Sequence, residues 1–505
     1  MDAGSTAVFV AVDIGASSGR VILGRITRPE SGGTAATPRI QMEVVHRFPN
    51  GVVTLDGHLR WDFDALLEEV LVGLTEAARV SNAQGERVIS IGIDTWAVDY
   101  GLVDPAGDLT AQPVSYRDDR TRATIDQVHR RIDQARLYST TGLQFLPFNT
   151  VYQLAAEKTL DGVQALLMPD LLAYRLTGER RTESTNASTT GLFDAVAGEW
   201  ATEIHEALGL PRDLFPPLVE AGRSIGALLP GVAERTKLPA STQVVAVGSH
   251  DTASAVAAVP AQSPQFAYIS SGTWSLVGLE LRHPVLTEAS RAANFTNERG
   301  VDGTIRYLRN VGGLWLLSEC QRTWTEQGMD EPLTSLLTAA AALPAGGPQV
   351  DVDDPAFIAP GGMPQRIQEA AVGAEHSAPG RPAAIVRCIL DSLALGYART
   401  IADAERLTDA RVDVVHIVGG GSQNQLLCQL TADATGKPVI AGPVEATALG
   451  NLLIQARAGG QIDGDLSSLR DLVAAGREPA YYEPRRTAPP STADLTSVPL
   501  GRTIA

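Results

Sequence analysis

Short apolar runs and helix-period segments alternate along the chain. Two strands are predicted at residues 8–12 and 21–26, where almost every position is apolar, with a tight polar turn between them. Apolar residues then recur at helical spacing over 62–79, with Asp62 or Asp64 as the N-cap. An alternation of strands and helices is typical of an α/β protein, so we predict the α/β fold class.

The same two patterns predict the remaining elements. The expected strands are 88–93, 244–247 and 412–418, and the expected helices are 121–137, 166–176 and 425–435. A strand, small polar turn and strand recur at 266–269 and 275–281. The recurrence favours duplicated α/β lobes facing a cleft, although so short a match could also arise by chance.

Two prolines within five residues, Pro260 and Pro264, favour a boundary between the lobes. We predict an N-terminal lobe at 5–260 and a C-terminal lobe at 265–480. A flexible tail rich in Pro, Thr and Ser is expected at 485–505.

Composition narrows the class of protein. The 505 residues carry a formal net charge of −17, which disfavours a nucleic-acid partner. The three cysteines are scattered singly, so neither a disulfide framework nor a CxxC metal site is expected. The first residues lack the features of a signal peptide, and no apolar run is long enough to span a bilayer. We therefore predict a cytoplasmic protein without a membrane partner.

The turn after the first strand has the form Asp-x-Gly-x-x-x-Gly. Its glycines would let backbone N–H groups approach an anion, and Asp13 could hold Mg²⁺, through water. Ser17, Ser18 and Arg20 add donors and one fixed cation suited to nucleotide phosphates. The alternative is a glycine-rich β-turn that needs no ligand.

A second candidate site follows the strand at 244–247, in the run from Gly248 to Thr252. Open α/β sheets bind their ligands at such strand ends, and Asp251 could accept a proton from an attacking hydroxyl. Alternatively, Asp251 or Ser249 only caps the following helix, and His250 is a packed, hydrogen-bonded histidine.

Further candidates lie in glycine-rich and aromatic segments. Residues 419–421 are consecutive glycines at a strand end, against which a ring or ribose could lie, or they form only a tight connection. Flat aromatics mixed with polar groups suit a sugar. The candidates for an apolar end of a sugar pocket are Trp96, Phe145 and Phe148.

Taken in order, these motifs resemble the FGGY carbohydrate kinases. The resemblance runs from residue 8 to about 455 and includes the stretches 12–21, 92–96, 142–150, 248–255, 270–275, 313–317, 416–421 and 441–447. It implies an actin-like ATPase fold of two ribonuclease H-like lobes around a central cleft. It also implies phosphorylation of L-rhamnulose by ATP to L-rhamnulose 1-phosphate, a step of L-rhamnose catabolism.

The resemblance also implies roles for individual residues. Asp251 would be the catalytic proton acceptor, and Asp13 would hold Mg²⁺. The nucleotide would be bound by Ala16, Ser17, Ser18, Gly19, Arg20, Thr273, Ser318 and Gly420. The sugar would be bound by Ala97, His250, Asp251, Thr252 and Asn310. Two positions depart from the usual family pattern: Ala97 replaces a frequent glycine, and Ser318 replaces a glutamine of some relatives.

Three alternatives remain open at the level of sequence. The substrate could be another ketose, such as L-fuculose, L-ribulose or L-xylulose, because stereochemistry is not visible in a sequence. A catalytically silent sugar sensor is disfavoured because Asp13 and Asp251 are both present. A scaffold that uses ATP as a switch, like actin, is disfavoured by the His-Asp-Thr run and the aromatics. Oligomeric state is not predicted.

Overall fold

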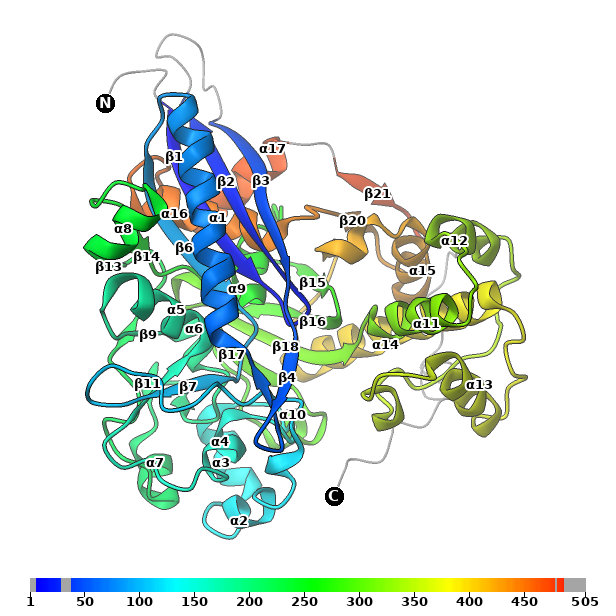
Figure 1. The fold of residues 1–505 in the computed structure, drawn as a ribbon. Coiled ribbons are helices and arrows are strands. Elements are labelled where there is room, and N and C mark those ends of the chain that lie inside the picture. Colours follow the sequence, from blue (N-terminus) through cyan, green and yellow to red (C-terminus); the bar gives the residue numbers. More distant parts are fainter. Residues whose placement is uncertain (1–5, 29–37, 477–478, 486–505) are drawn as a thin grey trace. The chain divides into compact units, whose positions relative to one another are not determined.

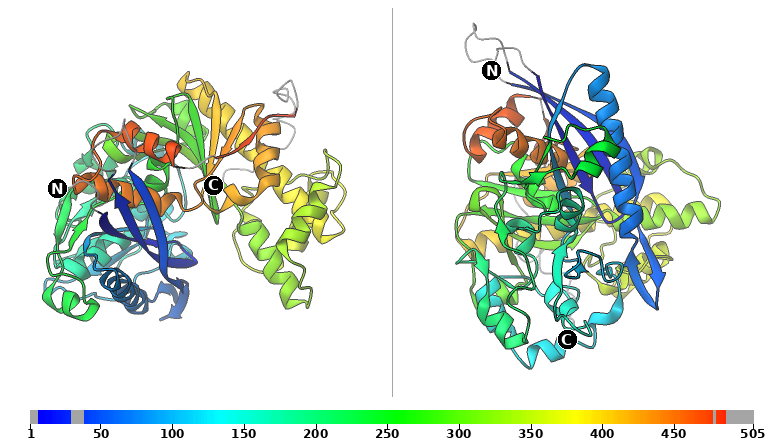
Figure 2. Two further views of the ribbon diagram at one scale, coloured as in Figure 1. Left: turned by 90° about the horizontal axis from the view of Figure 1, so that it is seen from above. Right: turned by 60° about the vertical axis from the view of Figure 1, so that its left-hand side comes forward.

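The computed structural model describes residues 6–28, 38–476 and 479–485, which form two compact units (Figures 1 and 2). The first unit comprises residues up to 262, together with 281–307 and 446–478. The second comprises 263–280, 308–445 and the residues from 479 onward. Most of the predicted tail, 485–505, lies outside the described residues.

A six-stranded mixed sheet forms the centre of the first unit. Its strand order is β13-β14-β6-β1-β2-β3, with bounds Ser224–Ala227, Gln243–Val245, Val88–Thr95, Thr6–Ile14, Ser18–Thr27 and Arg39–Pro49. β1 pairs antiparallel with β2 and parallel with β6, and β6 pairs parallel with β14. The carboxyl ends of β1, β6 and β14 therefore meet at one edge of the sheet.

Helices cover both faces of this sheet. Helix α1 (Phe63–Ala83) lies on one face, where its Gly73 admits Val21 of β2. Helix α16 (Ala446–Ala458) lies on the other face, where Gly24 of β2 admits Leu452. Because successive strand side chains point to opposite faces, residues three apart on β2 meet different helices. Asp62 caps α1 by accepting a hydrogen bond from the Ala65 N–H, as predicted.

Polar contacts explain why α16 belongs to the first unit, although the predicted boundaries placed it in the C-terminal lobe. Gln455 donates from Nε2 to the Val10 carbonyl at 2.9 Å and accepts from the Ser90 hydroxyl at 2.7 Å. Asn451 of the same helix donates to Asp94 at 2.5 Å. These buried hydrogen bonds tie α16 to β1 and β6.

The second unit repeats this plan around β15 (Phe266–Ser271), β16 (Trp274–Leu281), β18 (Ile305–Gly312), β19 (Val414–Val418) and β20 (Val439–Ala441). The sheet order is β17-β18-β16-β15-β19-β20-β21, where β21 is Ala480–Tyr482 and β17 (Thr296–Arg299) is counted with the first unit. As in the first unit, the initial strand pairs antiparallel with the next and parallel with a later one. The long helix α14 (Pro382–Thr408) packs on α15 (Gln425–Thr435), whose bounds are those predicted.

Two predicted helices differ in the structure. The segment 121–137 contains two short helices, α2 (Ile125–His129) and α3 (Gln134–Thr141), because Asp133 caps a new start by accepting from the Arg136 N–H. The segment 166–176 begins as strand β8 (Gln164–Leu167), and helix α5 runs from Met168 to Thr177. Pro169 fits the first turn of α5 but would break a helix begun earlier.

Candidate active site

The turn between β1 and β2 is held from one side. The Gly15 N–H donates to the Ser18 carbonyl at 2.9 Å, and Asn50 donates from Nδ2 to the Gly15 carbonyl at 2.8 Å. The Asn50 N–H donates to the Ser17 carbonyl at 3.1 Å. Ser17 and Ser18 are exposed, and Ala16 is half-buried. The turn thus has a fixed shape and an open outer side.

The two glycines of this turn, Gly15 and Gly19, have different surroundings. A Cβ at Gly15 would meet only the Ser18 carbonyl, at 3.6 Å, so its surroundings are open. A Cβ at Gly19 would lie 2.2 Å from the Phe48 ring, so packing against β3 already requires glycine there. The sequence predicts that an anion approaches the backbone of this turn closely. Of its two glycines, only Gly15 has the open surroundings that this approach requires.

Asp13 and Asp94 are neighbours at the sheet edge, paired across β1 and β6. Arg20, opposite Asp13 on β2, donates from Nε and Nη2 to Asp13 Oδ2 at 3.0 and 2.7 Å. Asp94 is completely buried, and its Oδ2 accepts from Asn451 while its Oδ1 has no hydrogen-bond partner among the described residues. Burial, followed by the nearby Asp13 charge, raises the pKa of Asp94 well above its usual value, and Asp251 contributes in the same direction.

This arrangement fits a divalent cation held mainly through water and phosphate. The charges of Asp13 and Asp251 raise the pKa of Asp94, and the Arg20 charge acts in the opposite direction. Asp94 also offers a buried oxygen without a hydrogen-bond partner in the described structure. Over that same part of the chain, no group of three or more His, Cys, Asp or Glu side chains has the geometry of a direct metal site. Hard carboxylate oxygens that leave room for water and phosphate are the usual ligands of Mg²⁺.

The run 248–252 connects β14 to helix α9 (Asp251–Ala257). Its position is fixed by buried Glu183, whose Oε2 accepts from the Ser249 hydroxyl at 2.8 Å and from the Ser249 N–H at 3.1 Å. The Ser249 side chain is therefore directed to Glu183. The N-cap of α9 is His250, which makes no side-chain capping bond. Asp251 is one-third exposed, and its Oδ1 accepts from the Thr252 hydroxyl at 3.0 Å.

His250 lies between Asp251 and a buried ion pair. Its Nε2 is 3.5 Å from Asp251 Oδ1, and its Nδ1 is 3.0 Å from Glu298 Oε2 on β17. Arg306 of β18 lies 3.0 Å from the same Glu298 oxygen and 3.1 Å from His250 Nδ1. Burial would raise the pKa of Glu298, but the Arg306 and His250 charges outweigh it and hold that pKa below its usual value.

The loop after β6 carries Ala97, which is half-buried. The next residue, Val98, has φ of 68°, a backbone conformation rare for a β-branched side chain. The Thr150 hydroxyl donates to the Val98 carbonyl at 2.7 Å and helps to hold this conformation. An enforced backbone at a sheet edge fits a binding role for the backbone of Ala97.

Buried Asp99 organises the aromatic groups beside this loop. Its Oδ2 accepts from the indole N–H groups of Trp61 and Trp96 at 2.7 and 3.0 Å and from the Tyr116 N–H at 3.1 Å. Ring contacts continue from Trp96 through Trp61 and Tyr116 to Phe148. Phe145 instead contacts His129 and Tyr152, so the three predicted aromatics belong to two clusters.

Burial raises the pKa of Asp99 to about 6, although four hydrogen bonds, including one from Gln153, oppose the shift. A proton therefore binds this carboxyl more tightly in the folded chain than in the unfolded one. Its stabilising effect is complete below pH 3.8, the ordinary pKa, and is lost as pH rises through about 6. Relative to Asp99→Asn, the parent should lose roughly 2 kcal/mol of unfolding free energy between pH 4 and 7. Urea unfolding of both proteins measures this, and a difference that does not change with pH would contradict it.

In the second unit, three backbone segments pack tightly together. The Leu314 N–H donates to the Gly272 carbonyl and the Trp315 N–H to the Thr273 carbonyl, at 3.1 and 3.2 Å. A Cβ at Gly313 would lie 2.3 Å from the Thr273 carbonyl oxygen, and one at Gly421 would lie 2.0 Å from the Ser271 hydroxyl. The hairpin turn, the start of α11 (Trp315–Glu326) and the glycine turn therefore form one cluster.

The remaining predicted residues lie in or near this cluster. Gly420 is exposed, with no atom within 4 Å of a Cβ built on it, and Thr273 is half-buried in the hairpin turn. Ser318 is exposed on α11, and its N–H donates to the Leu314 carbonyl at 2.9 Å. Asn310 is half-buried on β18, in the second unit, whereas His250, Asp251 and Thr252 lie in the first.

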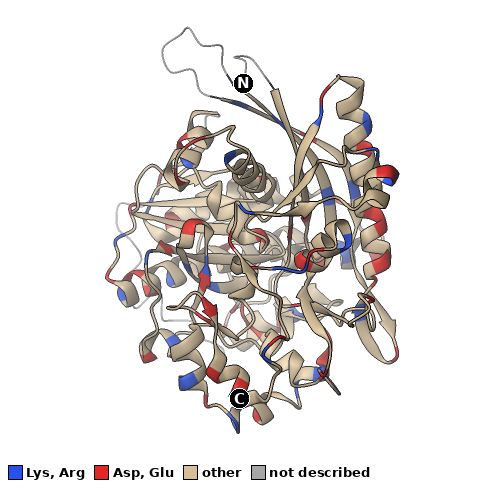
Figure 3. Cartoon of the chain, turned by 90° about the vertical axis from the view of Figure 1, so that its left-hand side faces the viewer, with Lys and Arg blue, Asp and Glu red and all other residues tan. Residues whose placement is uncertain are grey.

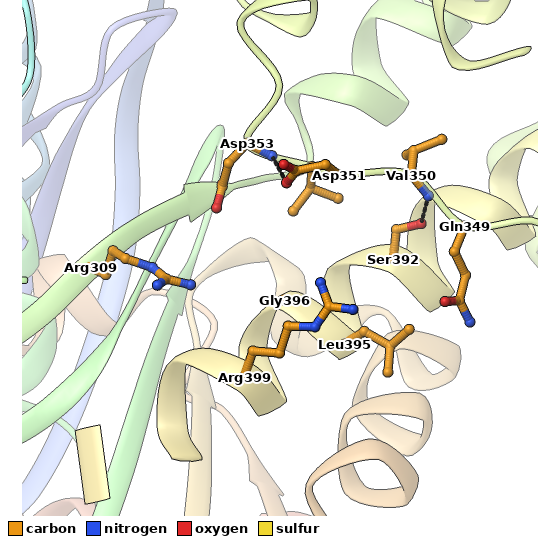
Figure 4. A pocket seen from close by; sticks show the side chains of 10 residues that line it. Arg309, Gln349, Val350, Asp351, Asp353, Ser392, Leu395, Gly396 and Arg399 are labelled. Atoms are coloured by element: carbon orange, nitrogen blue, oxygen red, sulfur yellow. Dashed lines mark hydrogen bonds between the residues drawn. The ribbon is translucent and has the colours of Figure 1, made fainter. Parts of the chain in front are cut away.

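A small polar cavity lies in the second unit (Figure 4). Its volume is about 20 Å³, room for one water molecule, and Arg309, Arg399, Asp351 and Asp353 line it with charges of both signs. Asp353 Oδ1 accepts from the Gly312 N–H at 2.8 Å. The cavity is too small for a nucleotide, and its lining residue Asp353 holds the backbone before α11.

Figure 3 shows acidic and basic residues interspersed over the elements it draws. In the described parts of the chain, no helix combines the length and apolar character that crossing a bilayer requires.

Comparisons with known proteins agree with this fold. The N-terminal domain model of the FGGY family of carbohydrate kinases matches residues 8–258, and the C-terminal domain model matches residues 267–459. The chain therefore belongs to the FGGY family of carbohydrate kinases and is an ATP-dependent sugar kinase. Its relatives include the rhamnulokinase of Bacteroides thetaiotaomicron, 40% identical over 95% of this chain and 96% of that protein. The rhamnulokinase of Klebsiella pneumoniae strain 342 is 43% identical over 88% of each chain.

Solved structures support the fold at much lower identity. The gluconate kinase of Lactobacillus acidophilus has a TM-score of 0.73 and 14% identity, covering 95% of this chain and 94% of its own. Plasmodium falciparum glycerol kinase with ADP has a TM-score of 0.71 and 15% identity, covering 96% and 95%. The predicted α/β class and two-domain actin-like ATPase fold are confirmed.

Sequence reasoning missed the residues that hold the predicted ones in place. Asp94 lies in the stretch 92–96 that resembles the family, and no role was predicted for Glu183, Glu298 or Arg306. For Asp94 a signal existed, because Asp13 and Asp94 both end buried strands. The other three carry no local signal, since they reach the site from distant elements.

Proposed function

We propose that the protein transfers the γ-phosphoryl group of ATP to the terminal hydroxyl of L-rhamnulose, giving L-rhamnulose 1-phosphate and ADP. The substrate assignment rests on one observation. The chain has a sequence identity of about 40%, over nearly its whole length, to several curated rhamnulokinases. The His-Asp-Thr run at a strand end supports the same reaction, because it offers a proton acceptor beside donors suited to sugar hydroxyls.

Asp251 is the proton acceptor in this proposal. Phosphoryl transfer has a loose transition state, so the protein contributes mainly positioning and charge neutralisation. The carboxylate orients the attacking hydroxyl and takes its proton. His250 and Thr252, both within contact distance of Asp251 Oδ1, share the binding of the sugar. Ala97 and Asn310 complete the proposed sugar-binding set.

The β1–β2 turn binds the phosphates in this proposal. Ala16, Ser17, Ser18 and Gly19 offer backbone and hydroxyl donors, and Arg20 offers a cation fixed by Asp13. Asp13 would hold Mg²⁺ through water, with Asp94 beside it. When bound, the metal ion supplies positive charge that neutralises the phosphate oxygens.

Thr273, Ser318 and Gly420 contact the nucleotide in this proposal. The support is that the hairpin turn, the start of α11 and the glycine turn pack into one cluster, with Gly420 exposed upon it. An exposed, side-chain-free backbone can lie flat against a ribose or base.

Substitutions at two neighbouring glycines distinguish an effect on ATP binding from an effect on folding. Gly420→Ala places its methyl group in open space, so the fold should be retained while the KM for ATP rises several-fold, because the methyl group would hold the nucleotide off the backbone. Gly421→Ala would clash with Ser271 and should destabilise the second unit. Thermal unfolding and ATP titration measure the two effects, with Gly380→Ala, at an exposed glycine of the second unit with open surroundings, as an additional comparison. An unchanged KM for ATP in Gly420→Ala would contradict the nucleotide contact.

The identity of the product tests the reaction. The protein is incubated with ATP, Mg²⁺ and L-rhamnulose, and the product is examined by phosphorus-detected NMR. The proposal predicts a phosphate monoester coupled to the two protons of carbon 1, formed in step with ADP. ADP release without a sugar phosphate, or a phosphate on another carbon, would reject it.

A further inference from the structure

The amide of Gln153 joins three segments of the first unit. Gln153 belongs to helix α4 (Thr150–Leu154), and only 1% of it is exposed. Its Nε2 donates to the Phe148 carbonyl at 3.0 Å and to Asp99 Oδ1 at 2.9 Å. Its Oε1 accepts from Arg120 Nη2 at 3.1 Å. A buried amide that is hydrogen-bonded at both ends ties together the segments that it contacts.

The neighbours of this amide decide which of its ends donates. Arginine has donors only, so the atom that faces Arg120 must be the amide oxygen. The other end faces the backbone carbonyls of Phe148 and Val98, at 3.0 and 3.4 Å, and a carbonyl can only accept. The two observations agree, so the amide has one orientation and its nitrogen holds both segments.

The backbone that Gln153 approaches makes a three-residue turn. The Asp99 N–H donates to the Ala97 carbonyl at 3.0 Å, and Val98 between them has φ of 68°. A hydrogen bond to the residue two positions back, with a positive φ between, defines the rarer and strained form of the γ-turn. Such a conformation persists only where its surroundings enforce it. Here α4 enforces it, because the Thr150 hydroxyl donates to the Val98 carbonyl at 2.7 Å and Gln153 approaches the same oxygen.

The same amide supports two aromatic candidates for the sugar pocket. It holds the backbone of Phe148 directly. It also holds Asp99, whose Oδ2 accepts from the Trp96 indole N–H at 3.0 Å. Within the described structure, the hydrogen bonds of Gln153 reach none of the residues proposed to bind ATP. Its contacts therefore concern the sugar side of the proposed site.

We propose that Gln153, together with Thr150, is a positioning residue that fixes the backbone at Ala97 and Phe148 before the sugar binds. The positioning stands on the contacts alone, whereas the sugar contact at Ala97 rests on the proposed function. A wall that already has its bound shape needs no ordering when the ligand arrives, and this strengthens binding. Loss of the amide should therefore weaken the binding of the sugar and leave that of ATP unchanged.

Gln153→Met keeps the length of the side chain and removes its amide, while Arg120 keeps its ion pair with Glu157 at 2.8 Å. We expect the KM for the sugar to rise about 5- to 20-fold, with kcat and the KM for ATP within about twofold of the parent. Steady-state kinetics with the sugar and ATP varied in turn measure this. The sugar is the ketose with the highest kcat/KM in a panel that includes L-rhamnulose. A failure of the L-rhamnulose assignment would appear as a different best ketose and would leave this comparison intact.

Thr150→Val removes only the hydroxyl that holds the Val98 carbonyl, and it should raise the KM for the sugar about 2- to 10-fold. Thr177→Val is the matched control, because it removes a buried hydroxyl that donates to the Ala173 carbonyl at 2.8 Å in α5, also in the first unit. The control should lower the temperature of thermal unfolding and keep the parental KM for the sugar. A sugar KM in Thr150→Val equal to that of the control, or a parallel rise of the KM values for sugar and ATP, would overturn the proposal. If Gln153→Met does not fold, the comparison of the two threonine variants decides the proposal.

Discussion

Asp251→Asn is expected to lower kcat for the sugar by roughly 10²- to 10⁴-fold, the usual range for losing a general base. The amide keeps the size of the side chain but cannot take the proton of the attacking hydroxyl. Nucleotide binding should persist, because Asp251 is not among the residues proposed to bind ATP. Steady-state kinetics together with ATP titration by calorimetry measure both quantities.

The same variant separates catalysis from a purely structural role at the start of α9. His250 is the N-cap of α9 and Asp251 is its first residue, so a purely structural Asp251 would tolerate an amide of the same size. Asp465→Asn is the matched control, because Asp465 caps α17 (Leu466–Ala475) by accepting from the Ser468 N–H. We expect the control to keep normal turnover. Normal turnover in a folded Asp251→Asn protein would remove Asp251 from the catalytic role.

Asp13→Ala is expected to lower turnover by roughly 10²- to 10³-fold at limiting Mg²⁺, as when one charge-stabilising group is lost. Added Mg²⁺ should restore part of this activity, because the carboxylate is proposed to hold the metal ion through water. The change also removes the ion pair between Asp13 and Arg20. Initial rates over a range of Mg²⁺ concentrations measure the effect.

Asp62→Ala provides the comparison for Asp13→Ala. It removes the N-cap of α1, also in the first unit, and should reduce the free energy of unfolding by about 0.5–2 kcal/mol without changing the Mg²⁺ dependence. A parent-like Mg²⁺ dependence in Asp13→Ala would mean that another carboxylate holds the metal ion, and Asp94 would be the next to test.

The strands and their turns were predictable because their signals are local. Residues 8–12 and 21–26 are apolar runs on either side of a small polar turn, and both lie within observed strands. The same holds for α15, which is bounded by Asn424 as N-cap and by Gly436 in the left-handed conformation. These features are encoded within a few residues of where they act.

Contacts between distant segments were not predictable in this way. Arg306 reaches His250 from 56 residues away, and Asn451 reaches Asp94 from 357 residues away. Phe145 and Phe148 were both candidates for one apolar end of a sugar pocket, yet their rings join different clusters. Contacts of this kind depend on tertiary packing, which no local sequence pattern predicts.

The sugar itself is the most direct test of the account. Purified protein, ATP and Mg²⁺ are assayed by ADP release with L-rhamnulose, L-fuculose, L-ribulose, L-xylulose, D-xylulose and glycerol. L-fuculose keeps the methyl group and differs in hydroxyl configuration, so a mispaired buried polar group should penalise it more than an apolar change would. We predict the highest kcat/KM for L-rhamnulose. Equal kcat/KM for L-rhamnulose and L-fuculose, or a preference for D-xylulose or glycerol, would contradict the substrate assignment.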